Sequence, residues 1–198
     1  MALALAALIG YLLGSIPFGF LIGLRQGIDV RKYGSGATGA TNVLRTLGGP
    51  PAAVTAALDA AKGLLAVYIG YRLGGELGYA WAGFGAVVGH SYPVWLGFRG
   101  GKSVVTSFAV LLPVAPVACL VGLAAGIAAI IPSRWVSLGS LTGALVTLLI
   151  IGFGGAVVPY KLLALGAVLV IYIRHWENIK RIAAGTENKL GQKARPRA

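Results

Sequence analysis

The sequence predicts an all-α integral membrane protein with about seven transmembrane helical segments, folded as one polytopic domain over residues 1–198. Three observations predict this fold class. Hydrophobic residues make up 57% of the chain and charged residues only 11%, whereas about 25% of a soluble domain is charged. The apolar residues fall in runs long enough to cross a bilayer. The basic residues gather in every other loop between the apolar runs. We therefore read the net charge of +12 as evidence for the orientation of the chain in the membrane, in preference to nucleic-acid binding.

Five apolar runs are each long enough for one spanning helix, because a bilayer core about 30 Å thick requires about 20 apolar residues. No basic residue precedes the first run and no Ala-x-Ala-like site follows it, so we expect no cleavable signal. The second run contains Asp59 and Lys62, and the last requires Lys161 to extend to an interface. In chain order the runs are Ala2–Leu24, Pro51–Tyr71, Leu77–Phe98, Trp135–Phe153 and Ala156–Ile173.

A sixth apolar run, Ser103–Ser133, needs a separate argument. As one helix it would be roughly 46 Å long, which is too long for one span and too short for two full ones. Proline removes a helical hydrogen bond and clashes with the preceding turn. We therefore expect two short helices broken near Pro113–Pro116, with a half-crossing hairpin as the alternative.

The basic residues set the orientation, because cytoplasmic loops concentrate Lys and Arg. The loop after the first run, the loop after the third and the tail are basic, and the opposite connections carry few charges. The third loop and the tail share a side only if Ser103–Ser133 makes two crossings or none. Two crossings give seven segments, with the N-terminus outside and the C-terminus cytoplasmic. The tail from Lys189 to Arg197 is also a signal for anionic lipid.

The first of three polar islands is GSGATGATNVLR, Gly34–Arg45. Glycine-rich turns that lead into a helix bind anions, because several N–H groups converge there. The planar guanidinium of Arg45 suits phosphate. A flexible basic loop that only obeys the topology rule is the alternative. Ser35 has no Asp or His nearby in sequence to activate it as a nucleophile.

The second island, GHSYPVWLGFRGGKS at Gly89–Ser103, contains Gly-Gly-Lys at 100–102. It is not a Walker A loop, because Leu96 stands where the first glycine of that motif would be and no strand precedes it. His90 lies in an apolar segment, where a hydrogen-bonded structural histidine is commoner than a catalytic one.

The third island is RHWENIKRIAAGTE, Arg174–Glu187. At helical spacing His175 and Asn178 share one face, with Arg181 one turn further on. A solvated cationic helix end is the alternative. On the predicted topology all three islands lie on the cytoplasmic side, so we expect them to build one site.

Asp59 and Lys62 stand three residues apart within the second run. Ionisable groups inside a membrane are costly and either pair or mark a site, and we favour a structural pair near the interface. No metal site is expected, because the chain has neither HxxxH nor CxxC spacing. We likewise expect no cofactor.

The islands provide for one or two phosphate groups, and the adjacent membrane helices give access to a lipid chain. The His-x-x-x-x-Asp acyltransferase pattern is absent, because Trp95 and Lys180 occupy the Asp position after the two histidines. A metal-dependent CDP-alcohol phosphotransferase would need more aspartates. The strongest alternative is an organic-anion or phosphate transporter, which would carry polar residues in both leaflets and symmetry between its halves. A lipid-binding scaffold is a third possibility.

Together the islands resemble the bacterial acyl-phosphate-dependent glycerol-3-phosphate acyltransferase family (PlsY). The resemblance covers nearly the whole chain, from GSIPFGFLIG at Gly14–Gly23 through DAAKG at Asp59–Gly63 and all three islands. It implies a multi-pass enzyme of the bacterial cytoplasmic (inner) membrane with its active site at the cytoplasmic face. The implied reaction moves an acyl group from acyl phosphate to the 1-hydroxyl of sn-glycerol 3-phosphate, giving lysophosphatidic acid and phosphate, the first step of phospholipid synthesis. Acyl-CoA and acyl-carrier protein are not expected as donors, and the implied partners are the two substrates and membrane lipids.

The resemblance also implies roles for particular residues. Two departures stand out: Ala37 replaces a common Asn, and Ser103 and Val105 replace Gly and Ala. Ser103 costs backbone freedom in an anion loop. The general base is either His175 or a substrate phosphate oxygen, and the lack of a catalytic dyad favours the phosphate, with His175 positioning. The implied catalytic residues are Ser35, Arg45, Lys102, His175, Asn178 and Glu187, and the implied phosphate-binding residues are Gly34, Gly36, Thr41, Asn42, Gly100, Gly101, Ser103 and Arg181.

Overall fold

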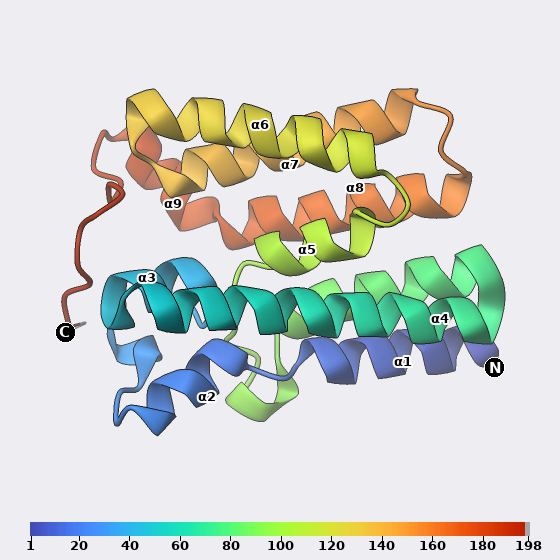
Figure 1. Ribbon diagram of the computed structural model, residues 1–198, viewed down its shortest axis with the longest axis horizontal. Coiled ribbons are helices and arrows are strands. Elements are labelled where there is room, and N and C mark those ends of the chain that lie inside the picture. Colours follow the sequence, from blue (N-terminus) through green and yellow to red (C-terminus); the bar gives the residue numbers. More distant parts are fainter. Residues whose placement is uncertain (197–198) are drawn as a thin grey trace.

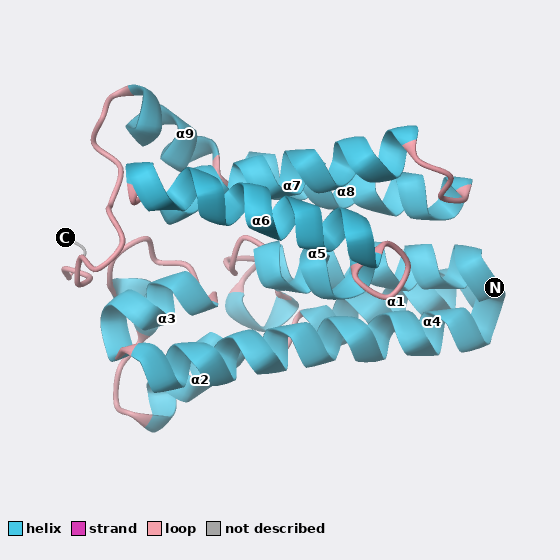
Figure 2. Cartoon of the chain, turned by 45° about the horizontal axis from the view of Figure 1, so that its top comes forward, coloured by secondary structure: helices cyan, strands magenta, loops and turns pink. Residues whose placement is uncertain are grey.

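The helices form two layers with a short helix, α5, between them (Figure 1 and Figure 2). One layer holds α1 to α4, and the other holds α6, α7 and α8 with α9 at one end. The computed structural model describes residues 1–196, so Arg197 of the basic tail lies outside the described residues. Within these residues the only β pairing is a single bridge between Tyr33 and Pro196. The α-helices are α1 (Ala2–Gly14), α2 (Phe18–Arg25), α3 (Ala40–Leu47), α4 (Gly49–Ser91), α5 (Val104–Leu111), α6 (Pro116–Ser133), α7 (Val136–Phe153), α8 (Val158–Arg174) and α9 (Trp176–Ala183), and the 3-10 helices are Val30–Lys32 and Val94–Leu96.

The first predicted span is two helices, because the chain breaks between α1 and α2 at Pro17. Proline lacks the N–H that a continuous helix would need there. The break leaves the carbonyl of Ile16 without a helical partner, and Lys62 Nζ donates to that oxygen at 2.8 Å. Lys62 therefore stabilises the bend in the neighbouring span, which gives the buried lysine a structural purpose.

The second and third predicted spans form a helical hairpin that runs through α4. Its turn lies at Gly74 and Gly75, whose backbone is non-helical, and Gly75 has a φ of 58° that favours glycine. A Cβ built on Gly78 would lie 2.1 Å from the carbonyl oxygen of Gly70, so the two arms approach backbone to backbone. Small residues permit such close packing of membrane helices.

The run Ser103–Ser133 breaks where its prolines predict, between α5 and α6. α5 has eight residues, about 12 Å of helix, which is shorter than a membrane core. α6 has 18 residues and is long enough to cross. Pro132 lies in the last turn of α6 and does not end it. The expected pair of short helices is therefore one short helix and one of full length.

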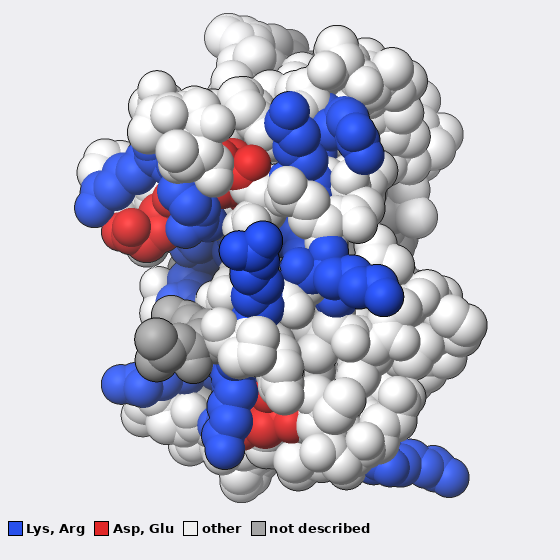
Figure 3. All heavy atoms as spheres, turned by 90° about the vertical axis from the view of Figure 1, so that its left-hand side faces the viewer, with Lys and Arg blue, Asp and Glu red and all other residues white. Residues whose placement is uncertain are grey.

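Within residues 1–196, four helical segments are long and apolar enough to cross a membrane, with the two arms of the α4 hairpin counted as one segment. A fifth is added if α8 and α9, bent by 59°, count as one span. After α9 the chain continues to residue 196 along the end of the molecule opposite the N-terminus (Figure 1). Lys and Arg gather on this end (Figure 3). We call it the basic end; the loops before α3 and before α7 lie there as well.

Candidate active site

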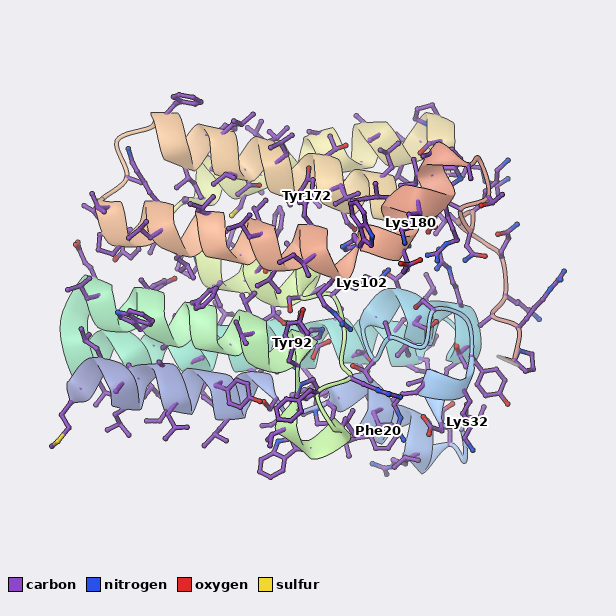
Figure 4. All side chains as sticks on the ribbon, turned by 180° about the vertical axis from the view of Figure 1, so that it is seen from behind. Phe20, Lys32, Tyr92, Lys102, Tyr172 and Lys180 are labelled. Atoms are coloured by element: carbon purple, nitrogen blue, oxygen red, sulfur yellow. The ribbon has the colours of Figure 1, made fainter. Side chains whose placement is uncertain are left out.

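A pocket of about 230 Å³ opens between the two layers near the basic end. It is lined by the loop before α3, by α4, by the starts of α5 and α7, and by the junction of α8 and α9. Lys102, just before α5, lies between the α3–α4 layer and this junction (Figure 4). The pocket brings together all six residues expected to be catalytic and three of those expected to bind phosphate: Ser35, Arg45, Lys102, His175, Asn178, Glu187, Thr41, Asn42 and Ser103.

Asn42 organises the first island from within. Its side chain is buried, and Nδ2 donates to the carbonyls of Val30 and Ala37, both at 2.9 Å. Its Oδ1 accepts a bond from the Ser35 N–H at 3.1 Å. The side-chain amide is thus engaged by the loop on both sides, and Asn42 shapes the loop instead of offering its amide to a phosphate.

Gly100 and Gly101, which were expected to bind phosphate, do not line the pocket. Their N–H groups donate to the carbonyls of Ser91 and His90, at 3.2 and 3.0 Å. Their carbonyls accept bonds from the Arg174 guanidinium at 3.2 and 3.1 Å. A Cβ on Gly101 would lie 2.1 Å from His90 Nε2. These glycines serve close packing against the end of α4.

Gly34, Gly36 and Arg181 also lie outside the pocket lining. The Gly34 N–H donates to the carbonyl of Arg195, and the Gly36 N–H donates to that of Tyr33, each at 2.9 Å. The N–H groups of Gly34 and Gly36 therefore hold the loop and the C-terminal segment.

Ser103 has a φ of 57°, in the left-handed region that favours glycine. A non-glycine residue there costs roughly 1–2 kcal/mol. The Ser103 hydroxyl offsets this cost, because it donates to the Val87 carbonyl at 2.6 Å and lies 2.6 Å from the Ser91 hydroxyl. Each such bond contributes about 1 kcal/mol. The serine found in place of the family's glycine is therefore accommodated by α4.

A chain of hydrogen bonds positions Lys102. Its Nζ donates to Oδ1 of Asn178. The Asn178 Nδ2 donates to Oε1 of Glu187 at 2.7 Å, and Ser137 donates to the same oxygen at 3.0 Å. Arg181 Nε donates to Oε2 at 2.8 Å, and the Glu187 side chain has no exposed surface. Glu187 is thus a positioning residue, because it turns the oxygen of Asn178 towards Lys102.

The charges of the pocket follow from burial. Burial lowers the pKa of Lys102 to about 8; Glu187 opposes this, and the nearby cations, Arg181 first, add to it. Burial, with the charge of Lys102, lowers the pKa of His175, which follows the α8 span, to about 4. Near pH 7 the pocket therefore holds a cationic Lys102 and a neutral His175. His175 Nδ1 lies 2.8 Å from the carbonyl of Ile171, so Nδ1 carries the proton and Nε2 is an acceptor.

Three helices begin at the pocket wall. Gly39 to Thr41 at the start of α3, Ser103 to Val105 at the start of α5, and Val136 and Ser137 at the start of α7 all line it. The first N–H groups of a helix have no intrahelical partner, and the helix dipole favours an anion there. Arg45 and Lys102 add full charges. The pocket is therefore built for an anionic ligand.

Sequence reasoning did not assign to the site four polar residues of the pocket wall: Asp59, His90, Ser137 and Ser140. Asp59 Oδ1 lies 2.7 Å from Lys62 Nζ and 3.4 Å from His90 Nδ1. The expected structural pair is present, but it extends to His90 and reaches the pocket. The presence of Asp59 and Lys62 in an apolar run could have indicated that this part of α4 reaches the site. The two serines gave none, because hydroxyl residues are common in membrane helices.

An apolar groove of about 370 Å³ adjoins the polar pocket. It runs between α4, α5, α6 and α7, and it shares Val104, Val105 and Ser140 with the pocket. The remaining wall is aliphatic side chains, Phe108 and the small residues of α6 and α7. The site therefore has a charged compartment and an apolar compartment that meet at the start of α5. No cluster of three or more His, Cys, Asp or Glu suited to a metal ion occurs in residues 1–196.

A bundle of apolar helices with an anion pocket that opens on an apolar groove defines a multi-pass membrane protein with a site for amphiphilic phosphorylated compounds. The family model of glycerol-3-phosphate acyltransferase matches residues 4–185. The chain belongs to the glycerol-3-phosphate acyltransferase family.

Relatives and solved structures agree with this assignment. The chain is 62% identical to the glycerol-3-phosphate acyltransferase of Symbiobacterium thermophilum, over 97% of this chain and 96% of that protein. It is 46% identical to that of Carboxydothermus hydrogenoformans, over 94% and 96%. Crystal structures of PlsY (YgiH), an integral membrane glycerol 3-phosphate acyltransferase, match at 34% identity over 96% of each chain, with TM-scores of 0.90 for the glycerol 3-phosphate form and 0.88 for the lysophosphatidic acid form.

Proposed function

We propose that the protein transfers an acyl group from acyl phosphate to the 1-hydroxyl of sn-glycerol 3-phosphate, giving lysophosphatidic acid and inorganic phosphate. One observation carries this proposal: the cationic pocket and the apolar groove share the start of α5. A phosphorylated fatty acyl donor has a doubly charged head and an apolar chain, so it fits both compartments at once. The solved structures of PlsY carry glycerol 3-phosphate and lysophosphatidic acid in their names, which supports the acceptor and the product.

The pocket supplies positive charge for two phosphate groups. Lys102 stands just before the N-terminus of α5, and Arg45 stands in the last turn of α3; both line the pocket. In this proposal one phosphate belongs to the acceptor and the other to the donor. Holding both reactants in one orientation accelerates the reaction by making it effectively unimolecular. Ser35 contributes a hydroxyl at the same wall.

The acceptor hydroxyl oxygen attacks the acyl carbon, the bond between that carbon and the phosphate oxygen breaks, and phosphate leaves. The hydroxyl proton passes to an oxygen of the departing phosphate. His175, neutral with a pKa lowered to about 4, positions the hydroxyl through its acceptor nitrogen. The charge of Lys102 stabilises the negative charge that develops on the carbonyl and phosphate oxygens. The protein needs no covalent nucleophile, because acyl phosphate is itself an activated acyl group.

We further propose that the chain crosses the bacterial inner membrane in seven segments, with the N-terminus outside and the pocket at the cytoplasmic face. The basic end supports this orientation, since cytoplasmic surfaces of membrane proteins concentrate Lys and Arg. The N-terminus lies at the other end of the molecule. The water-soluble acceptor then enters from the cytoplasm and the acyl chain enters from the bilayer.

The test is direct. Purified protein in neutral detergent is mixed with glycerol 3-phosphate and palmitoyl phosphate, without metal, CoA or carrier protein. We expect lysophosphatidic acid and phosphate in equal amounts by mass spectrometry and phosphate assay. Palmitoyl-CoA and palmitoyl-carrier protein serve as matched donors and should give no product. Product from either of them, with none from acyl phosphate, would disprove the proposed donor.

A further inference from the structure

A second polar cavity, of about 800 Å³, lies on the basic end beside the pocket. We call it the outer cavity. Its wall is formed mainly by the C-terminal segment from Gly185 to Pro196, together with Gly34 and Arg45. The proposed reaction takes place in the catalytic pocket, and none of its steps uses the outer cavity.

The outer cavity is strongly cationic. Four of its residues are basic, Arg45, Lys189, Lys193 and Arg195, against the single carboxylate of Glu187. That carboxylate is already bound by Arg181 at 2.8 Å and by two neutral donors. The three basic residues of the tail are exposed, and no ion pair is found for them within residues 1–196. Their charge therefore faces the cavity and solvent without a protein counter-ion.

The outer cavity adjoins the catalytic pocket, because Arg45 and Glu187 line both. Arg45 belongs to both walls, and its guanidinium donates to the carbonyl of Asn188 in the outer wall at 3.3 Å. The Arg45 guanidinium could thus interact with an anion in the outer cavity and with an anion in the pocket.

The wall of the outer cavity is held in place by backbone bonds at separate points. The Ala194 N–H donates to the Arg45 carbonyl at 2.9 Å, and the Gly34 N–H donates to the Arg195 carbonyl at 2.9 Å. At its other end the Leu190 N–H donates to the Arg134 carbonyl at 2.6 Å. The tail is therefore a strap across the basic end, and its basic side chains occupy defined positions beside the pocket.

We propose that the outer cavity is a capture site for the phosphate group of the water-soluble substrate, which is held there before Arg45 passes it to the catalytic pocket. This inference rests on the proposed function for the identity of that substrate, glycerol 3-phosphate. A cavity lined by one sign of charge raises the local concentration of an oppositely charged ligand and its association rate. The apolar donor arrives through the membrane and does not pass this way.

The test removes the charge and keeps the strap. The variant K189Q/K193Q/R195Q leaves every backbone bond of the strap available. Its matched control is R25Q/K32Q/R99Q, which removes three exposed cations that line neither cavity. Both are assayed in neutral detergent at low ionic strength. We expect the KM for glycerol 3-phosphate to rise roughly three- to tenfold in the first variant only, with kcat and the KM for acyl phosphate within about twofold of wild type.

Salt and direct binding give two further readouts. The dependence of kcat/KM on salt should be shallower in K189Q/K193Q/R195Q, and the two proteins should converge at high ionic strength, because the lost interaction is screened. Inorganic phosphate should bind more weakly to this variant than to wild type when binding is measured by calorimetry. This measurement tests the capture site independently of the reaction. If wild type formed no lysophosphatidic acid, that result would contradict only the proposed function. The single reversal K193E should raise KM in the same direction and guards against misfolding of the triple variant.

Three results would overturn the capture site: a wild-type KM and salt slope in the tail variant, an equal rise of KM in the control, or an effect that appears only in vesicles containing anionic lipid. The last result would assign the cations to lipid headgroups, the other source of phosphate at this face.

Discussion

At the scale of single residues, Lys102 is a cation of the pocket that a chain of hydrogen bonds holds in position. Asn178 receives its hydrogen bond, and Glu187 fixes the orientation of Asn178. We predict that Lys102→Ala lowers kcat roughly 100-fold or more, because removal of one preorganised group that stabilises transition-state charge has effects of this size. The measurement is steady-state lysophosphatidic acid formation in detergent.

Cys119→Ala is the control for Lys102→Ala, since Cys119 is buried in the apolar core and is far from any proposed role. Its activity should stay within about twofold of wild type while its unfolding midpoint falls modestly, as expected for a smaller core side chain. Full activity of Lys102→Ala would contradict the assignment of this lysine to the site.

The depressed pKa of Lys102 predicts an alkaline limit to activity. With a pKa of about 8 in the free protein, the required cation is present below pH 8 and is lost as the pH rises through that value. We predict that kcat/KM is about half of its plateau value near pH 8, approaches the plateau about one pH unit lower, and falls steadily above pH 8. The alkaline fall in kcat should occur at a higher pH than the fall in kcat/KM, because a bound phosphate stabilises the protonated form of Lys102.

The variant Lys102→Arg tests this origin, because its guanidinium stays protonated throughout the range. It should be less active than wild type and should lack the alkaline limb. A limb at the same pH in Lys102→Arg would show that another group titrates.

The same hydrogen-bond chain shows how far sequence reasoning reaches at this scale. It predicted that Lys102, Asn178 and Glu187 share a site, because polar residues in islands on one membrane face are brought together by topology. It could not predict that Glu187 acts through Asn178. Nor could it predict the hydrogen bonds that the Gly100 and Gly101 N–H groups make to α4, because the partners of a main-chain N–H depend on the folded loop and not on residue type.

At the scale of elements, the packing of α6 on α7 depends on glycine. Gly122 and Gly126 on α6 face Gly143 and Gly139 on α7, and a Cβ on Gly126 would lie 2.7 Å from the Gly139 carbonyl oxygen. We predict that Gly126→Ile destabilises the protein by roughly 1–3 kcal/mol, the usual cost of overpacking, and lowers its thermal unfolding midpoint in detergent.

Gly152 on α7 supplies the matched position, because a Cβ there meets nothing within 4 Å. Gly152→Ile should leave the midpoint nearly unchanged. Equal midpoints for the two variants would show that the α6–α7 contact does not need small residues.

Element boundaries divide into those that the sequence predicts and those that it does not. Prolines predict the break between α5 and α6 and lie at the break before α2, because proline interrupts a helix by its own covalent structure. The end of α5 at Leu111, two residues before Pro113, has the same local cause. The start of α5 has none, because it depends on where α4 returns the chain to the pocket, which is a property of the packed molecule.

At the scale of the whole molecule, charge and fold agree in part. Lys and Arg gather at one end of the molecule (Figure 3), where the tail and the loops before α3 and before α7 lie. The loop between α4 and α5, which the sequence predicted to share that side, lies nearer the middle of the molecule (Figure 1). Counting charges could predict the basic end because Lys and Arg positions depend on insertion and not on packing. The groove that joins the pocket was beyond such counting, because it is assembled from α4, α5, α6 and α7 together.

The last prediction concerns the orientation of the chain in the membrane. Single cysteines introduced into a Cys119→Ala background can test it in cells. Arg99→Cys marks the loop between α4 and α5, and Gly155→Cys marks the α7–α8 turn, at the end of the molecule opposite the basic end; both positions are exposed. We predict that a membrane-impermeant maleimide labels Gly155→Cys in intact cells and labels Arg99→Cys only after permeabilisation. The reverse pattern would invert the topology. Leu112→Cys, 42% exposed at the end of α5, decides the number of crossings: labelling from outside means that the turn between α5 and α6 reaches the outer surface, whereas protection on both sides means that α5 enters the membrane only part of the way.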